Sequence, residues 1–164
     1  MDDVLFLDAQ DRIAAFLQRG QEGDEPLVQD LLEGMARNRA DFTLTFRRLC
    51  DAAEDAAGDS EVRPLFAEPS AYDDWAARWR QRLGEEPQAA AERAKMMRSV
   101  NPAFIPRNHR IEAVIQAAVG RDDYAPFEEL LTVLSKPYED QPAFSQYAHP
   151  PEPHQRVLQT FCGT

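Results

Sequence analysis

Two prolines set four residues apart constrain the fold of this chain more than any other feature. Pro102 and Pro106 lie between two helical patterns. Each lacks an amide donor and disfavours helical backbone at the residue before it, so a helix cannot run through this segment. Phe104 and Ile105, between the prolines, are apolar and predict a connection anchored in a core. We therefore expect a rigid joint between two helices, with the structural motif Asn101, Pro102, Arg107 and Asn108.

Apolar residues recur at three- and four-residue spacing on both sides of this joint, which is the pattern of helices with one buried face. Before the joint, three such stripes are Leu27, Val28, Leu31, Leu32 and Met35; Phe42, Phe46, Leu49, Cys50 and Ala53; and Tyr72, Trp75, Ala76, Trp79 and Leu83. After it, two more are Ile111, Val114, Ile115, Ala118 and Val119; and Phe127, Leu130, Leu131 and Leu134, expected to point inward. No stretch alternates as a strand would, so we predict an all-α, irregular array of about seven helices.

Polar residues at the ends of these patterns predict the helix boundaries. Asp24 and Asp41 are candidate caps for the two helices that follow them. Ser70 with Asp73 resembles a capping box. Asn108 or a neighbour is expected to cap the helix after the joint, and Gly120 to close it.

The outward face of the helix that starts near Phe42 is predicted to carry Arg47, Arg48 and Asp51. For the pairs and clusters of arginines, including Arg78, Arg80 and Arg82, local ion pairs are favoured over phosphate binding, because the chain is acidic. The aromatic stripe is predicted to be core, since such a stripe is rarely a ligand cage.

We expect two regions, a helical one over 1–136 and a proline-rich tail over 137–164. The tail contains five of the twelve prolines and is expected to run extended across a surface. Its apolar anchors would be Tyr138, Phe144, Tyr147 and Phe161.

The charge balance excludes several classes of partner. The net charge of −11 argues against nucleic acid, which demands a basic footprint, and against an anionic membrane surface. No apolar run approaches the roughly 20 residues that span a bilayer. Met1-Asp2-Asp3 lacks a basic signal region. Two cysteines fit a reducing compartment, so we expect a cytoplasmic protein.

The residue types required for catalysis do not converge in this sequence. The seven glycines are scattered and form no phosphate-binding loop, and lysine occurs only at Lys95 and Lys136. His109, His149 and His154 have no metal-ligand spacing with one another or with a cysteine. We therefore predict no catalytic, cofactor-binding or metal residue in this chain.

Four segments, in order along residues 24–164, resemble the selenoprotein O (SelO/YdiU) family. They are Ala40–Leu49; Asn101–His109, which is similar to the family's NPxxxxRN segment; Lys136–Tyr138 with Gln141-Pro142; and Arg156–Thr164. The resemblance implies a protein adenylyltransferase with a kinase-like catalytic fold, which moves AMP from ATP to hydroxyl side chains of proteins. This chain resembles only the C-terminal helical part. The ATP- and magnesium-binding motifs belong to the kinase-like region, and no position here matches them.

The resemblance also singles out Cys162, third from the end of the chain. At this place the family carries a selenocysteine or cysteine used in redox control, which can pair with a cysteine of the kinase-like region. An incidental exposed thiol is the alternative. Cys50 lies on an apolar helix face and is expected to be buried and inert. A bridge between Cys50 and Cys162 stays open, because sequence cannot place the two within disulfide reach.

The implied role is therefore to support the kinase-like lobe of a larger protein and to carry a redox cysteine. The expected partners are that lobe and the protein substrates of the parent. The main alternative is a stand-alone helical module that binds other proteins. An exposed apolar patch of more than a few hundred Å² would favour a domain that has lost its neighbour, whereas a stand-alone module would cover such a patch or self-associate through it. An enzyme with a site between helices is a third, less favoured interpretation.

Overall fold

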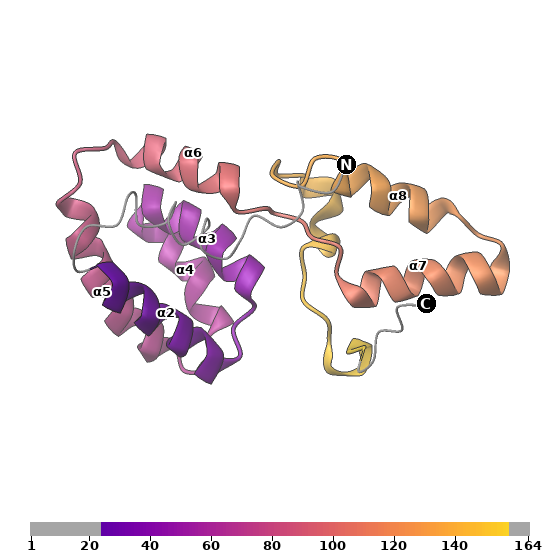
Figure 1. Cartoon of the computed structure of the whole chain (residues 1–164), viewed down its shortest axis with the longest axis horizontal. Coiled ribbons are helices and arrows are strands. Elements are labelled where there is room, and N and C mark those ends of the chain that lie inside the picture. The colour runs from indigo at the N-terminus through magenta and orange to yellow at the C-terminus, as the bar shows by residue number, and fades with distance from the viewer. Residues whose placement is uncertain (1–23, 158–164) are drawn as a thin grey trace. The chain divides into compact units, whose positions relative to one another are not determined.

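The computed structural model describes residues 24–157 and is all-α (Figure 1). Over these residues it has seven α-helices joined by turns and 3-10 helices, and no strand. This confirms the predicted irregular array. The chain divides into two compact units, Met1–Pro102 and Ala103–Thr164, so the boundary falls inside the double-proline joint.

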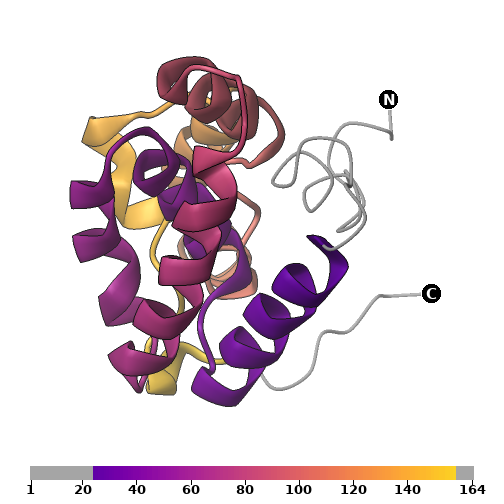
Figure 2. The same cartoon turned by 90° about the vertical axis from the view of Figure 1, so that its left-hand side faces the viewer.

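The first unit carries five of the α-helices, and Figure 2 shows this unit facing the viewer. They are α2 (Asp24–Asn38), α3 (Phe42–Glu54), α4 (Asp59–Val62), α5 (Pro69–Gly84) and α6 (Ala90–Val100), with 3-10 helices η1 (Ala56–Gly58) and η2 (Arg63–Leu65). Helix α3 packs against both α6 and α4, and α2 packs against α5.

The predicted aromatic stripe of α5 is the centre of this unit's core. Tyr72 is fully buried, and Trp75 and Trp79 are nearly so. The two indole rings stack with their centroids 5.2 Å apart. Trp75 Nε1 donates a hydrogen bond to the carbonyl of Leu27 at 2.8 Å, which fixes α5 against α2. The interpretation as core is confirmed.

Three caps were predicted in this unit. Helix α2 begins at Asp24 itself, whose carboxylate binds Arg82. The cap at Asp41 is confirmed and the one at Ser70 is wrong. Leu44 N donates to Asp41 Oδ1 at 2.8 Å, so Asp41 caps α3 as expected. Helix α5 begins at Pro69 with no side-chain cap, which excludes the Ser70–Asp73 capping box. Asp73 instead binds the guanidinium of Arg63, with Nε to Oδ1 at 2.7 Å.

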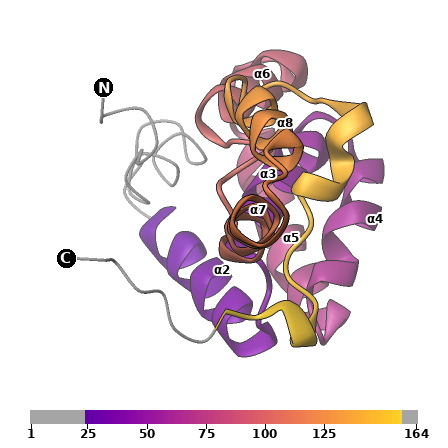
Figure 3. The ribbon, with the colours of Figure 1, turned by 90° about the vertical axis from the view of Figure 1, so that its right-hand side faces the viewer.

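The second unit contains α7 (Asn108–Arg121), α8 (Ala125–Leu134) and the 3-10 helices η3 (Pro142–Tyr147) and η4 (Pro153–Gln155). Figure 3 shows α7 nearly end-on, with α8 beside it; α8 packs against α7 and against η3. Two amides of the joint, those of Ala103 and Phe104, donate to the carbonyl of Pro137 at 2.8 and 3.1 Å. These bonds tie the joint to the residues that follow α8.

The ends of α7 differ from the prediction. The helix begins at Asn108 itself, and no side chain caps it. It continues through Gly120 to Arg121 and ends at Asp122, whose φ of 54° is left-handed. Aspartate tolerates this conformation because its short polar side chain bonds locally. A glycine was therefore not needed at this end.

Helix α8 ends at Leu134, and the proline-rich segment follows it. Where extended backbone was expected, η3 and η4 form short 3-10 turns. Tyr147, expected as an apolar anchor, is attached through its polar end, since its hydroxyl donates to Glu129 on α8 at 2.7 Å. The expected anchor Phe161 lies outside the described residues. None of the helices in the described part of the chain is long and apolar enough to span a bilayer.

Candidate functional site

Arg47 is buried, although the sequence pattern predicted it on the outer face of α3; that prediction is wrong. Only 7% of the residue is exposed. Its guanidinium donates to the carbonyl of Asn101 at 3.0 Å and to that of Arg98 at 3.3 Å. These carbonyls lie at the C-terminal end of α6, where a helix leaves acceptors without internal partners. A cation placed there also suits the helix dipole.

The four residues of the joint motif are placed in two pairs. Asn101 is fully buried at the end of α6, and its side-chain amide donates to the carbonyl of Met97 at 2.9 Å. Pro102 follows it and closes the first unit. Arg107, 7% exposed, and Asn108, exposed, begin α7 in the second unit. Each pair ends or starts a helix, which is a structural role.

The arginines of α5 are engaged in ion pairs, as the sequence predicted. Each binds a carboxylate of another element at hydrogen-bonding distance: Arg78 to Asp30, Arg80 to Asp59, and Arg82 to Asp24. The last pair extends into a buried network, because Arg82 also meets Glu86 at 3.2 Å, and Glu86 meets Arg93 at 3.0 Å. These contacts hold α2, α5 and α6 together.

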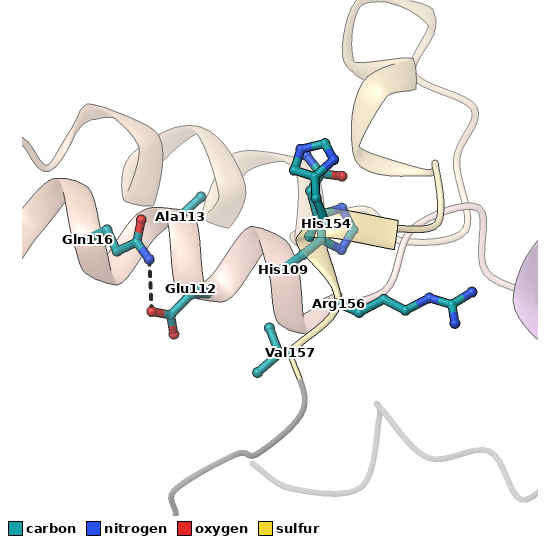
Figure 4. Close-up of a pocket in the computed structure, with 8 residues that line it drawn as sticks. His109, Glu112, Ala113, Gln116, His154, Arg156 and Val157 are labelled. Carbon is teal, nitrogen blue, oxygen red and sulfur yellow. Dashed lines mark hydrogen bonds between the residues drawn. The ribbon is translucent and has the colours of Figure 1, made fainter. Parts of the chain in front are cut away.

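An open cavity lies along α7 in the second unit (Figure 4). Its volume is about 530 Å³, and its lining comprises His109, Glu112, Ala113, Gln116, His154, Gln155, Arg156 and Val157. A second cavity of about 440 Å³ shares His109 and the Gln155–Val157 wall and adds Ile105, Pro106, Arg107 and Asn108. Residues of the joint motif thus line part of this site.

Within the cavity, His109 is the side chain with altered chemistry. The residue is 9% exposed, and its Nδ1 is buried without a hydrogen-bond partner among the described residues. Burial lowers the pKa of the imidazole, and the positive charges of Arg110 and Arg107 lower that pKa further. A neutral imidazole at neutral pH follows. From the sequence, His109 was expected to be no metal ligand and was named as the last residue of the Asn101–His109 segment.

The remaining polar groups of the cavity do not converge on one point. Gln116 Nε2 donates to Glu112 Oε1 at 3.0 Å, so these two partly satisfy each other. Arg156 extends away from them (Figure 4). Over residues 24–157, no three side chains of His, Cys, Asp or Glu are grouped so that they could hold a metal ion. The cavity is a polar recess, and the described residues place no nucleophile beside a base in it.

The two cysteines have separate outcomes. Cys50 is fully buried, and its thiol donates to the carbonyl of Phe46 at 3.2 Å. Burial raises the pKa of this thiol to about 12, so it is the inert cysteine that was expected. Cys162 lies outside the described residues.

Arg47 and His109 were missed by sequence reasoning, and only Arg47 left a signal. Arg47 is four residues after Thr43 and three before Cys50, both buried, so helical spacing puts all three on one face. The prediction placed Arg47 on the outer face because its side chain is charged, although the spacing indicates the buried face. His109 shares its cavity with Gln155, Arg156 and Val157, which lie far along the chain, and sequence spacing does not report such neighbours.

The comparisons with known proteins match this chain to one family. The family model for protein adenylyltransferase SelO matches residues 12–135. A protein nucleotidyltransferase YdiU of Bradyrhizobium sp. (strain BTAi1 / ATCC BAA-1182) is 68% identical over 143 residues, which cover 87% of this chain and 29% of that protein. One of Bradyrhizobium diazoefficiens is 64% identical over 153 residues, covering 93% of this chain and 30% of that protein. One of Rhodopseudomonas palustris (strain BisB18) is 65% identical over 144 residues, covering 88% and 29%.

The chain therefore spans about 30% of the length of these curated relatives. Its match to the family model covers most of its own length, and the identities to relatives exceed 60%. Matches of this extent are specific to one family. The chain belongs to the protein adenylyltransferase SelO family.

Proposed function

We propose that this chain is the C-terminal helical region of a protein adenylyltransferase, which transfers AMP from ATP to hydroxyl groups of proteins. The observation that carries the proposal is the family match over residues 12–135, together with relatives named as nucleotidyltransferases. The chain corresponds to less than a third of such a relative. Its function is therefore one part of what the longer parent protein does.

The proposed part of this chain is to support the catalytic region, whereas ATP and Mg²⁺ bind elsewhere in the parent. Phosphoryl-type transfer needs donors around the phosphates and ligands for the metal. The cavity along α7 has neither a glycine-rich loop nor a convergent set of carboxylates among its lining residues. The residues that the structure describes do not fit the metal, so no step of the transfer is assigned to them. The kinase-like lobe of the parent would supply both sites and is the proposed partner, with the parent's protein substrates.

Cys162 would add redox control to this support. Its thiol and a thiol of the kinase-like region would form a disulfide, losing two protons and two electrons to an oxidised disulfide such as glutathione disulfide, which becomes two thiols. Cys50 is an unsuitable partner because it is buried with a raised pKa. A cytoplasmic location belongs to the same proposal, since a reducing compartment would keep the two cysteines as free thiols.

Calorimetry with ATP and Mg²⁺ tests the proposal. Two proteins are compared: this chain, and a chimera in which it replaces the matching 143 residues of the Bradyrhizobium sp. BTAi1 relative. We expect no heat of binding from the chain alone, and binding with AMP transfer to a protein from the chimera. Binding or transfer by the chain alone would overturn the proposal, and so would a folded chimera that does neither.

The redox part has its own measurement. Glutathione disulfide is expected to lower the transfer rate of the chimera, and dithiothreitol to restore it. A Cys162→Ser chimera should keep its rate in both. An equal response of the two chimeras would exclude Cys162 as the switch.

A further inference from the structure

Five large apolar side chains are exposed among the described residues, and all of them lie between residues 115 and 131. They are Ile115, Val119, Tyr124, Phe127 and Leu131, with 49%, 84%, 55%, 45% and 52% of their surface exposed. Two are on α7, two on α8 and one between the helices. We call this set the hairpin face; α7 and α8 are seen together in Figure 3.

The exposure contradicts the inward placement that the sequence pattern predicted for Phe127 and Leu131. In the first unit, residues at the same helical spacing are buried, as Trp75 and Trp79 show. On α7 and α8 the buried apolar positions are only Ala117, Leu130 and Val133. An amphipathic helix stays amphipathic when its partner is absent, so the pattern is intact although the described residues of the second unit leave it uncovered. Five exposed large apolar side chains on one pair of packed helices and their connection favour an interaction surface.

The charges in the same segment of the chain restrict what can cover the hairpin face. The acidic side chains between residues 112 and 131 are Glu112, Asp122, Asp123, Glu128 and Glu129, whereas Arg121 is the single basic one. A second copy of this chain would bring the same acidic segment against itself, and facing like charges disfavour association. A suitable partner has an apolar centre and a rim of Lys and Arg.

We propose that the hairpin face docks onto the part of the parent protein that this chain does not span, at an apolar surface with a basic rim. This inference rests on the proposed function, in which the chain is one region of a longer protein. The relatives extend to more than three times the matched length, so the missing cover has a source in the same polypeptide. The same docking would attach the helical region to the catalytic one.

The test measures how fast a thiol introduced at position 119 reacts with a maleimide. Val119→Cys is placed in a Cys162→Ser background, where Cys50 is buried and unreactive. The control is Ser145→Cys in the same background, an exposed position on η3 outside the hairpin face. Both are made in the isolated chain and in the chimera with the Bradyrhizobium sp. BTAi1 relative.

In the isolated chain both introduced thiols should react at the rate of a free thiol. In the chimera we expect the reaction of the Val119→Cys thiol to slow by at least about 10-fold and that of the Ser145→Cys thiol by less than about 3-fold, as burial of one face requires. Equal rates for the Val119→Cys thiol in chain and chimera would overturn the proposal, as would equal slowing at both positions. Slowing of the Val119→Cys thiol that grows with the concentration of the isolated chain would overturn it too, and would assign the face to a second copy.

A second variant gives an independent reading. Val119→Lys should barely change the melting temperature of the isolated chain, because the side chain is already in water. In the chimera the same change would place a charge in the apolar centre and lower the melting temperature by several degrees. An unchanged chimera would contradict docking through Val119.

ATP binding and AMP transfer by each chimera separate this inference from the proposed function. An active chimera whose Val119→Cys thiol reacts freely refutes the docking alone. An inactive chimera in which that thiol is protected refutes the function alone.

Discussion

Arg47 links two helices through hydrogen bonds at the end of α6. Its guanidinium serves the carbonyls of Arg98 and Asn101, and the residue as a whole is buried. Carbonyls at a buried helix end need partners, since leaving them unpaired costs about 1 to 3 kcal/mol each. Arg47 therefore supplies the donors that allow α6 to end at the joint without leaving these two carbonyls unpaired.

Replacing Arg47 by Met keeps the apolar stem and removes the donors. We expect Arg47→Met to lower the free energy of unfolding of the chain by about 2 kcal/mol, measured with urea. The control is Arg48→Met, whose guanidinium is partly exposed and 4.0 Å from Asp51. That change should stay within about 0.5 kcal/mol. Equal effects of the two variants would contradict a special role for Arg47.

His109 makes the second unit sensitive to acid. Its pKa is lowered from the ordinary 6.5 by burial and by Arg110 and Arg107. The folded chain therefore binds this proton less readily than the unfolded chain. The contribution to stability is full above pH 6.5 and is lost as the pH falls through the lowered pKa of the folded state.

Proton NMR of the imidazole signals tests this sign. We expect the signal that His109→Gln removes to titrate with a midpoint below the ordinary 6.5. The drop in α7 stability between about pH 7.5 and about pH 5.5, followed by amide exchange, should be smaller in His109→Gln than in the natural chain. His149→Gln serves as the control because its side chain is exposed. A midpoint for His109 at or above the ordinary value would contradict the argument.

At the scale of elements, α3 and the 3-10 helix η1 approach each other through Gly58. A Cβ atom added at this residue would lie 2.6 Å from the amide nitrogen of Ala52 and 2.7 Å from the carbonyl carbon of Asp51. Both are backbone atoms of α3, which cannot move aside without disturbing the helix. The sharp return of the chain after α3 therefore depends on a missing side chain.

The prediction is that Gly58→Ala lowers the free energy of unfolding by about 2 kcal/mol, the usual cost of overpacking. Gly34→Ala is the matched control, in the middle of α2 in the same unit. Its added methyl would lie 3.8 Å from Phe66, an ordinary contact, so the better helix propensity of alanine should raise stability by about 1 kcal/mol. Urea unfolding of both variants measures the difference in sign. The same sign for both would contradict the close approach at Gly58.

The elements also show which parts of the structure the sequence could predict. Apolar spacing placed the cores of α2, α3 and α5, because it reports directly on one-sided burial. Capping failed at Asp73, whose carboxylate binds Arg63 ten residues earlier, a tertiary contact that no local pattern contains. The inward placement predicted for Phe127 and Leu131 was wrong for a different reason. Spacing identifies the apolar face of a helix but not whether other residues cover that face. The candidate cavity around His109 was not predicted, since residues of α7 and the tail meet there only in the fold.

At the scale of the molecule, the two units bury very different amounts of apolar surface. In the described part of the second unit, the buried apolar side chains are Phe104, Ala117, Leu130 and Val133. The other buried apolar side chains, including both tryptophans, are in the first unit. Because buried apolar area drives folding, the second unit should be the less stable one when the chain is alone.

Amide hydrogen exchange followed by mass spectrometry checks this difference. In the isolated chain we expect peptides from α7 and α8 to exchange at least about 100-fold faster than peptides from α3, equivalent to about 2.7 kcal/mol of opening free energy. In the chimera with the Bradyrhizobium sp. BTAi1 relative, covering the hairpin face adds the apolar burial that the second unit lacks. Exchange in α7 and α8 should then slow toward that of α3, with α3 itself unchanged. Equal exchange of α3 and α7 in the isolated chain would show that the few buried apolar side chains of the second unit suffice, and that this unit needs no cover to be stable.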